Sequence, residues 1–156
     1  MADVDLAPNQ VVFNHVGVCV TDVARSRTFY EQVLDFSFWW ELDAPEDTGS
    51  KLLQLPKPLG LHAVYLVRDG FVLELLAYHP DRVEPWRKRT MAEPGLTHIS
   101  VSVGDLDRVA ERARRFGGEV IEETRMPGAV MIRDPDGQLI ELLTAEWLAA
   151  LPPRPA

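Results

Sequence analysis

The chain has 156 residues, of which 16 are lysine or arginine and 24 are aspartate or glutamate, so its net charge at neutral pH is −8. A hydrophobic content of 46% at this length suits one domain with a substantial core. The negative charge makes nucleic acid and anionic membrane surfaces poor partners, and no apolar stretch approaches the roughly 18 residues of a membrane span. One cysteine and an N-terminus without a signal-peptide pattern favour a cytoplasmic location.

The first predicted element is a strand that starts near His15 and leads into a helix. Residues 14–18 read Asn-His-Val-Gly-Val, which places the histidine on a face of small residues and the valines on the opposite face. Asp22 follows as a helix N-cap. Five residues at helical spacing then form one stripe, namely Ser26, Phe29, Tyr30, Val33 and Leu34.

The same pattern returns later in the chain. Residues 97–101 read Thr-His-Ile-Ser-Val, and His98 lies 83 residues after His15. Asp105 follows this histidine at the spacing found in the first copy. The apolar stripe of a second helix comes next, formed by Leu106, Val109, Ala110 and Ala113. An internal repeat of this kind predicts two structural modules of one design.

Each copy ends with a turn and a strand that carries a glutamate. The turns are Arg68-Asp69-Gly70 and Asp134-Pro135-Asp136-Gly137, whose Asp-Gly pairs are typical of hairpins. Glu74 follows the glycine of the first turn by four residues, and Glu141 follows that of the second by the same number. Because a turn fixes strand register, both glutamates should occupy equivalent faces.

The first copy is longer than the second. The glutamates lie 67 residues apart and the histidines 83, so the first copy carries 16 extra residues, which we place between Trp39 and Gly60. Several prolines and the polar residues 46–50 predict a long loop there. This loop is either a lid over a substrate or a plain surface insertion.

These elements give strand, helix and three strands, then a linker and the same order again. The predicted fold class is α+β, with two tandem βαβββ modules in a single domain of residues 1–156. Module one spans about 11–78, the linker about 79–95, module two about 96–145 and the C-terminal tail 146–156.

Four of the repeated residues have the character of metal ligands. Glu74 and Glu141 each stand in the middle of an apolar strand, where a carboxylate without a cationic partner costs several kcal/mol. No lysine or arginine recurs at matched positions of the strands to pair with both glutamates, whereas His15 and His98 recur there. We therefore predict that the four residues bind one divalent metal ion. Zn, Ni, Co, Mn and Fe(II) all suit a set of imidazoles and carboxylates.

The repeated segments resemble the vicinal oxygen chelate superfamily, which includes glyoxalases, bleomycin resistance proteins and extradiol dioxygenases. The resemblance covers about residues 11 to 145 and rests on residues 14–18, 29–34, 97–101, 134–137 and 141–142. It implies a curved mixed sheet, or half-barrel, around a metal, with one ligand from the first and last strand of each module. Those positions are His15, Glu74, His98 and Glu141, and a chain with both modules is expected to form the site within itself.

The resemblance also implies a glyoxalase-like or epimerase-like enzyme, a lyase or isomerase. In such an enzyme Glu74 or Glu141 would move a proton beside a metal-chelated carbonyl of a small organic substrate. The alternatives are an Fe(II) ring-cleaving dioxygenase with His15, His98 and Glu141 as ligands, and a protein that binds a drug or metabolite without catalysis. A homodimer is the expected assembly.

Some further side chains bear on the substrate. The run Phe38-Trp39-Trp40, together with Trp86, hints at an apolar or aromatic substrate, although ordinary packing is the simpler explanation. An anionic group of a substrate could meet Arg125, Arg133 or Lys57, for which solvation at the surface is the simpler role.

Overall fold

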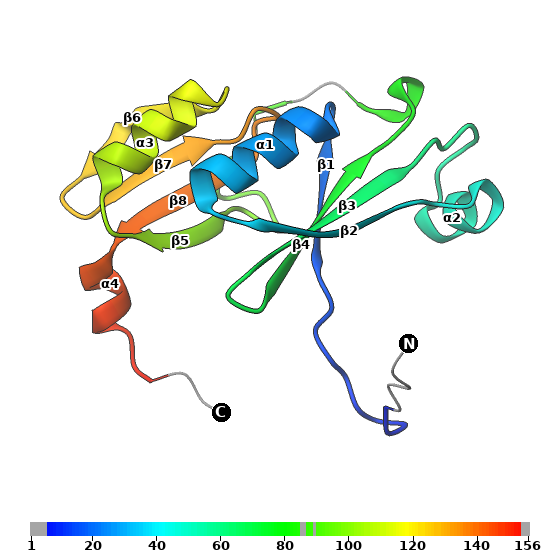
Figure 1. Ribbon diagram of the computed structural model, residues 1–156, viewed down its shortest axis with the longest axis horizontal. Helices are drawn as coiled ribbons and strands as arrows, with labels where there is room; N and C mark the ends of the chain where they lie inside the picture. The colour runs from blue at the N-terminus through cyan, green and yellow to red at the C-terminus, as the bar shows by residue number, and fades with distance from the viewer. Residues whose placement is uncertain (1–5, 85–86, 89, 154–156) are drawn as a thin grey trace.

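The structure is a computed structural model that describes residues 6–84, 87–88 and 90–153. Two four-stranded mixed sheets lie next to each other (Figure 1). The helix α1 contacts the first sheet, α3 contacts the second, and the two helices contact each other. The α+β class and the tandem βαβββ order are confirmed, and neither sheet closes into a barrel. Within the described ranges, every helix is too short or too polar to cross a bilayer.

The first module contains the strands β1 (Val16–Val20), β2 (Ser37–Asp43), β3 (His62–Arg68) and β4 (Phe71–Ala77), and the helices α1 (Val23–Leu34) and α2 (Glu46–Leu53). Its strand order is β1-β4-β3-β2, with β1 parallel to β4 and the other pairs antiparallel. The strand beside His15 therefore lies directly against the strand that carries Glu74.

The second module repeats this design after a short 3-10 helix (Pro80–Arg82) in the linker. It contains β5 (Ile99–Val103), α3 (Leu106–Arg115), β6 (Glu119–Met126), β7 (Ala129–Arg133) and β8 (Leu139–Thr144), in the strand order β5-β8-β7-β6. The pairing of β5 with β8 is parallel, as in the first module.

The chain does not become a tail at residue 146. Residues Ala145–Ala150 form the helix α4, which contacts β5 and β8. The run Ala-Glu-Trp-Leu-Ala-Ala is rich in helix-forming residues, but it is too short to show a helical period in the sequence. The predicted tail is therefore corrected to a short helix followed by the last residues of the chain.

Both long helices begin at the predicted aspartates. Asp22 accepts a hydrogen bond from the backbone N–H of Arg25 at 3.0 Å, and Asp105 accepts one from Arg108 at 2.9 Å. The stripe predicted for α1 is buried in full, and α3 buries three of its four predicted residues. These stripes share one core with the helix-facing sides of both sheets. The opposite faces, which carry the histidines and glutamates, are left uncovered by these helices.

The extra segment of the first module contains a helix where a long loop was predicted. Residues Glu46–Leu53 form α2, whose first turn carries Glu46 and Asp47, where negative charge favours a helix. The Glu46 carboxylate also accepts the backbone N–H groups of Leu59 at 2.9 Å and Gly60 at 2.8 Å, which fastens the end of the segment. None of the residues of α2 is buried, so no apolar stripe marked the helix in the sequence. That the segment acts as a lid stays a hypothesis.

A polar network joins the two modules. Asp134, at the turn between β7 and β8, is 3% exposed and accepts a hydrogen bond from the Tyr30 hydroxyl at 3.0 Å. Burial raises the pKa of Asp134. Asp136 of the same turn accepts a hydrogen bond from Ser26 at 3.0 Å and lies 2.6 Å from the Arg25 guanidinium. The turn predicted as a simple hairpin therefore also docks module two on the start of α1.

Replacing Asp136 by Asn should weaken this docking in a pH-dependent way. Burial alone would raise the pKa of Asp136, but hydrogen bonds from Thr21, Arg25 and Ser26 outweigh it and hold the pKa below its ordinary value. A carboxyl of this kind stabilises the fold fully above its unfolded-state pKa, and that contribution is lost as pH falls through the folded-state pKa. We expect Asp136→Asn to lower the free energy of unfolding by about 1–3 kcal/mol at neutral pH, with a difference that shrinks below about pH 4.

Urea unfolding of the wild type and the variant across that pH range measures the effect. The matched control is Asp69→Asn in the exposed turn of the first module, which should change the free energy of unfolding by less than about 0.5 kcal/mol. Equal losses in the two variants, or a loss for Asp136→Asn that persists in acid, would contradict the expected role.

Candidate metal centre

The two glutamates lie at equivalent places in their sheets. Glu74 of β4 is in register with Gly17 of β1, and Glu141 of β8 is in register with Ser100 of β5. Gly17 and Ser100 are themselves equivalent positions of the repeat. The equal spacing from each turn has therefore produced equal register, as the sequence predicted.

The first pair consists of His15 and Glu74. His15 lies one residue before β1, and its Nε2 is 2.9 Å from Oε2 of Glu74. The hydroxyl of Tyr65, on β3, donates a hydrogen bond to the other carboxylate oxygen. Glu74 is 9% exposed. Both of its oxygens have a partner, as the high cost of an unpaired buried carboxylate requires.

The second pair consists of His98 and Glu141, which are held more loosely. His98 Nε2 lies 3.6 Å from Glu141 Oε2, and the Ser100 hydroxyl donates to that same oxygen at 2.7 Å. The side chain of Glu141 is 31% exposed, against 11% for that of Glu74. The two carboxylates therefore share a register position but differ in burial and in partners.

The residue before each histidine orients the imidazole. Asn14 Oδ1 lies 2.6 Å from His15 Nδ1, and Thr97 Oγ1 lies 2.9 Å from His98 Nδ1. An amide oxygen can only accept, so with this amide orientation the Nδ1 of His15 carries the hydrogen. A neutral ring then turns the lone pair of Nε2 toward Glu74, and the two groups repel unless a proton or a cation lies between them. This donor set fits a divalent metal, with the Nδ1 contacts fixing the rings.

The four predicted ligands form two pairs and not one cluster. Across the residues that the structure describes, no three histidine, cysteine, aspartate or glutamate side chains are grouped closely enough to hold a metal. A cavity of about 670 Å³ beside His98 and Ser100 extends to Gly17 of β1, the edge strand of the other sheet. One chain in this conformation therefore presents two half-sites, in contrast to the expected complete site. The binding of one metal by all four residues stays a prediction.

Two tryptophans of the aromatic run on β2 contact Tyr65. The register of β2 shifts between Phe38 and Trp40, so Trp39 is the additional residue of a β-bulge. Both indoles contact Tyr65 for this reason, Trp40 stacked with ring centroids 4.7 Å apart and Trp39 edge-on at 6.4 Å. Trp40 keeps 41% exposure and Trp39 57%, so they pack and still leave apolar surface beside the first pair. Trp86 lies outside the described residues.

Tyr65 was not among the residues that the sequence singled out, although a signal for it was present. The Asp69-Gly70 turn, with φ of 49° and 77°, pairs Arg68 with Phe71. Counting back along this hairpin places Tyr65 opposite Glu74. Burial, together with the hydrogen bond to Glu74, raises the pKa of Tyr65 well above its ordinary value, so the phenol stays protonated and donates.

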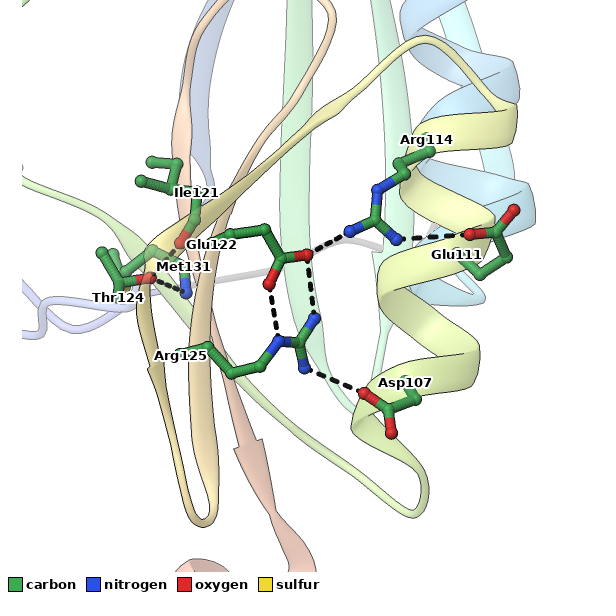
Figure 2. Close-up of polar contacts among 8 residues, drawn as sticks. All are labelled: Asp107, Glu111, Arg114, Ile121, Glu122, Thr124, Arg125 and Met131. Carbon is green, nitrogen blue, oxygen red and sulfur yellow. Dashed lines mark hydrogen bonds and ion pairs between the residues drawn. The ribbon is translucent and has the colours of Figure 1, made fainter.

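The basic residues considered for an anionic substrate are paired with carboxylates. Figure 2 shows Arg125 of β6 between Glu122, at 2.7 Å, and Asp107 of α3, at 2.9 Å. The other two candidates are paired likewise, Lys57 with Asp47 and Arg133 with Glu119. These contacts favour the surface role for Arg125 and Lys57. The Arg133 side chain is only 13% exposed and also donates a hydrogen bond to the Gly137 carbonyl at 3.2 Å, so the predicted solvation of Arg133 is corrected to packing within the protein.

The chain is similar to known proteins both in sequence and in fold. Residues 12–142 match the family model of the Glyoxalase/Bleomycin resistance protein/Dioxygenase superfamily. The chain is 30% identical over 163 aligned positions to a lactoylglutathione lyase of Pseudomonas putida, with coverage of 91% of this chain and 90% of that protein.

Several solved structures share the fold. A glyoxalase family protein from Bacillus cereus superposes with a TM-score of 0.74 at 17% identity, covering 90% of this chain and 98% of its own. The trypanothione-dependent glyoxalase I of Leishmania major gives a TM-score of 0.64 at 24% identity, covering 86% and 87%. The fosfomycin resistance protein FosX of Listeria monocytogenes, solved with Mn(II) and sulfate, gives 0.58 at 16% identity, covering 85% and 91%. A divalent metal is thus present in at least one protein of this fold.

Metal binding by the two pairs can be tested on protein that carries no affinity tag. After reconstitution with Zn, Ni, Co, Mn or Fe(II), elemental analysis should find about one saturable ion per chain. The double variant His15→Ala/His98→Ala should lose this binding. The matched control, His62→Ala/His79→Ala, removes the same number of imidazoles away from both pairs and should bind as the wild type does. Equal binding by the two double variants would refute the assignment of the ligands.

Proposed function

Because the chain belongs to the Glyoxalase/Bleomycin resistance protein/Dioxygenase superfamily, we propose that it is a divalent-metal-dependent enzyme of the glyoxalase or epimerase type. The proposed reaction is proton transfer beside a carbonyl of a small organic substrate. The observation that carries the proposal is the equivalent His15/Glu74 and His98/Glu141 pairs, one on each sheet. The relative named lactoylglutathione lyase supports the same class of chemistry.

The two pairs together would supply two imidazole nitrogens and two carboxylates to the metal. A bound divalent cation supplies Lewis acidity, which polarises a substrate carbonyl and makes the neighbouring C–H group more acidic. A glutamate at position 74 favours this class over a ring-cleaving dioxygenase. A dioxygenase of that kind would use three ligands and leave Glu74 outside the set. The exposed indoles of Trp39 and Trp40 would give an apolar group of the substrate a surface to pack on.

Glu141 is the better base of the two carboxylates. Tyr65 and His15 occupy both oxygens of Glu74, which suits a ligand that stays in place. For Glu141, the contacts within the described chain all involve Oε2, and the side chain is more exposed. A base has to reach the substrate carbon, take its proton and return it to a neighbouring atom, which requires such freedom of movement.

A second chain would complete the site. We place the His15/Glu74 pair of one chain opposite the His98/Glu141 pair of its partner, which gives two identical sites in a two-fold homodimer. Two observations support this assembly. Neither pair gains a third ligand within the described residues. The histidines flank β1 and β5, which are both edge strands of their sheets.

Substitution of each glutamate tests the proposed chemistry. Glu141→Gln should retain most of the metal but slow proton transfer by roughly two to four orders of magnitude, because an amide is not a base. Glu74→Gln keeps a ligating oxygen and should slow it far less, whereas Glu74→Ala should also weaken metal binding. The exposed Glu111→Gln on α3 is the matched control and should behave as the wild type.

The measurement is solvent-deuterium exchange into a panel of 2-hydroxy-ketones and acyl-thioesters, alongside metal affinity. Unchanged exchange in Glu141→Gln would overturn its role as the base. Oxygen consumption with catechols by the Fe(II) form would favour the dioxygenase alternative. Ligand binding that persists after chelation and without turnover would favour a binding protein.

Mixing of two inactive variants tests the assembly. His15→Ala/Glu74→Ala removes the first pair, and His98→Ala/Glu141→Ala removes the second, so neither homodimer has a complete site. In a mixed dimer, the intact first pair of one chain meets the intact second pair of the other. Refolding the two variants together at equal amounts should restore about one quarter of the wild-type metal sites, the share expected for random pairing. No recovery would place the complete site within one chain.

A further inference from the structure

The two carboxylates receive their hydrogen bonds from different strands. Tyr65 faces Glu74 across β3 and β4, and the equivalent position across from Glu141 on β7 is Met131. A methionine side chain has no hydrogen to donate. Glu141 instead takes its hydrogen bond from Ser100, whose counterpart in the first module is Gly17. The two modules therefore differ in the side chain that donates a hydrogen bond to each glutamate.

The ring of Tyr65 is restrained on several sides. Trp40 lies nearly parallel to it, with an interplanar angle of 12°, and Trp39 meets it edge-on. His15 approaches it edge-on as well, with ring centroids 5.6 Å apart. Tyr65 itself is 9% exposed. A ring packed in this way keeps its hydroxyl in one place, so the hydrogen bond to Glu74 has a fixed direction.

We propose that Tyr65 is a positioning residue that holds the Glu74 carboxylate with Oε2 turned toward His15, in the orientation for metal binding. This inference rests on the proposed metal-dependent function. Tyr65 contacts Oε1 and leaves Oε2 to His15 and the metal, so it acts through Glu74. An outer group that orients a ligating carboxylate raises metal affinity because less freedom is lost when the metal binds.

A purely structural role would be the competing explanation. The phenol would then only satisfy a buried carboxylate, as Tyr30 does for Asp134 at the contact between the modules. Tyr30 is fully buried and its hydrogen bond involves neither half-site. Tyr30→Phe is therefore the matched control for Tyr65→Phe, since each variant removes one phenol hydroxyl from one buried carboxylate.

The experiment is a Co(II) titration of metal-free wild type, Tyr65→Phe and Tyr30→Phe, followed by the visible absorption of the bound ion. Tyr65→Phe should bind Co(II) about 10- to 100-fold more weakly and change the absorption bands, because the geometry of one ligand is altered. Tyr30→Phe should match the wild type in affinity and spectrum. Thermal unfolding of the metal-free proteins separates these effects from a general loss of stability.

A further variant keeps the hydroxyl and releases the ring. Trp40→Leu removes the stacked partner of Tyr65 and should weaken Co(II) binding in the same direction but by less. It also decides the question if Tyr65→Phe does not fold. Wild-type affinity and an unchanged spectrum in Tyr65→Phe, or in Trp40→Leu where the former fails to fold, would overturn this inference and leave the proposed function standing. Absence of Co(II) binding by the wild type would overturn both.

Discussion

A carboxylate in the interior of an apolar strand has to find a partner, and strand register decides which partner it can reach. In the first module, the hairpin between β3 and β4 and the parallel pairing of β1 with β4 bring Tyr65 and His15 to Glu74. The same register in the second module brings His98 and Ser100 to Glu141. The rest of the candidate centre depends on this constraint, because it converts two residues distant in sequence into one binding group on each sheet.

The packing of the helices determines which sheet faces are left for chemistry. The stripes of α1 and α3 share a core with the valine side of β1 and with the corresponding side of the second sheet. The histidine and glutamate side of each sheet faces away from the core that α1 and α3 share, and the turn at Asp134 and Asp136 fixes how the modules dock. Both modules therefore bury their apolar faces in one core. Their histidines and glutamates do not form one cluster among the described residues.

The two modules are alike in backbone and different in chemistry. Exchange of tyrosine for methionine opposite the glutamate, and of glycine for serine on the neighbouring strand, leaves one carboxylate restrained and the other freer. A duplicated site of this kind can divide its work, since a ligand benefits from rigidity and a base benefits from movement. The bulge at Trp39 adds to the difference, because it brings two indoles against Tyr65. The described strands of the second module contain no tryptophan.

Local periodicity in the sequence by itself determined the repeat, the helix N-caps at Asp22 and Asp105, the buried stripes and the register of Glu74 and Glu141. Each of these depends on residues close together in the chain, where the geometry of a helix or a hairpin leaves little choice. The tertiary structure alone decided that α2 replaces a loop, that Asp136 joins the modules and that the four predicted ligands lie as two pairs. The helix α2 buries none of its residues, so no hydrophobic period could mark it in the sequence. The other two features depend on how separate elements approach each other, and the free energy of that packing is shared among many weak contacts that no short segment of sequence contains.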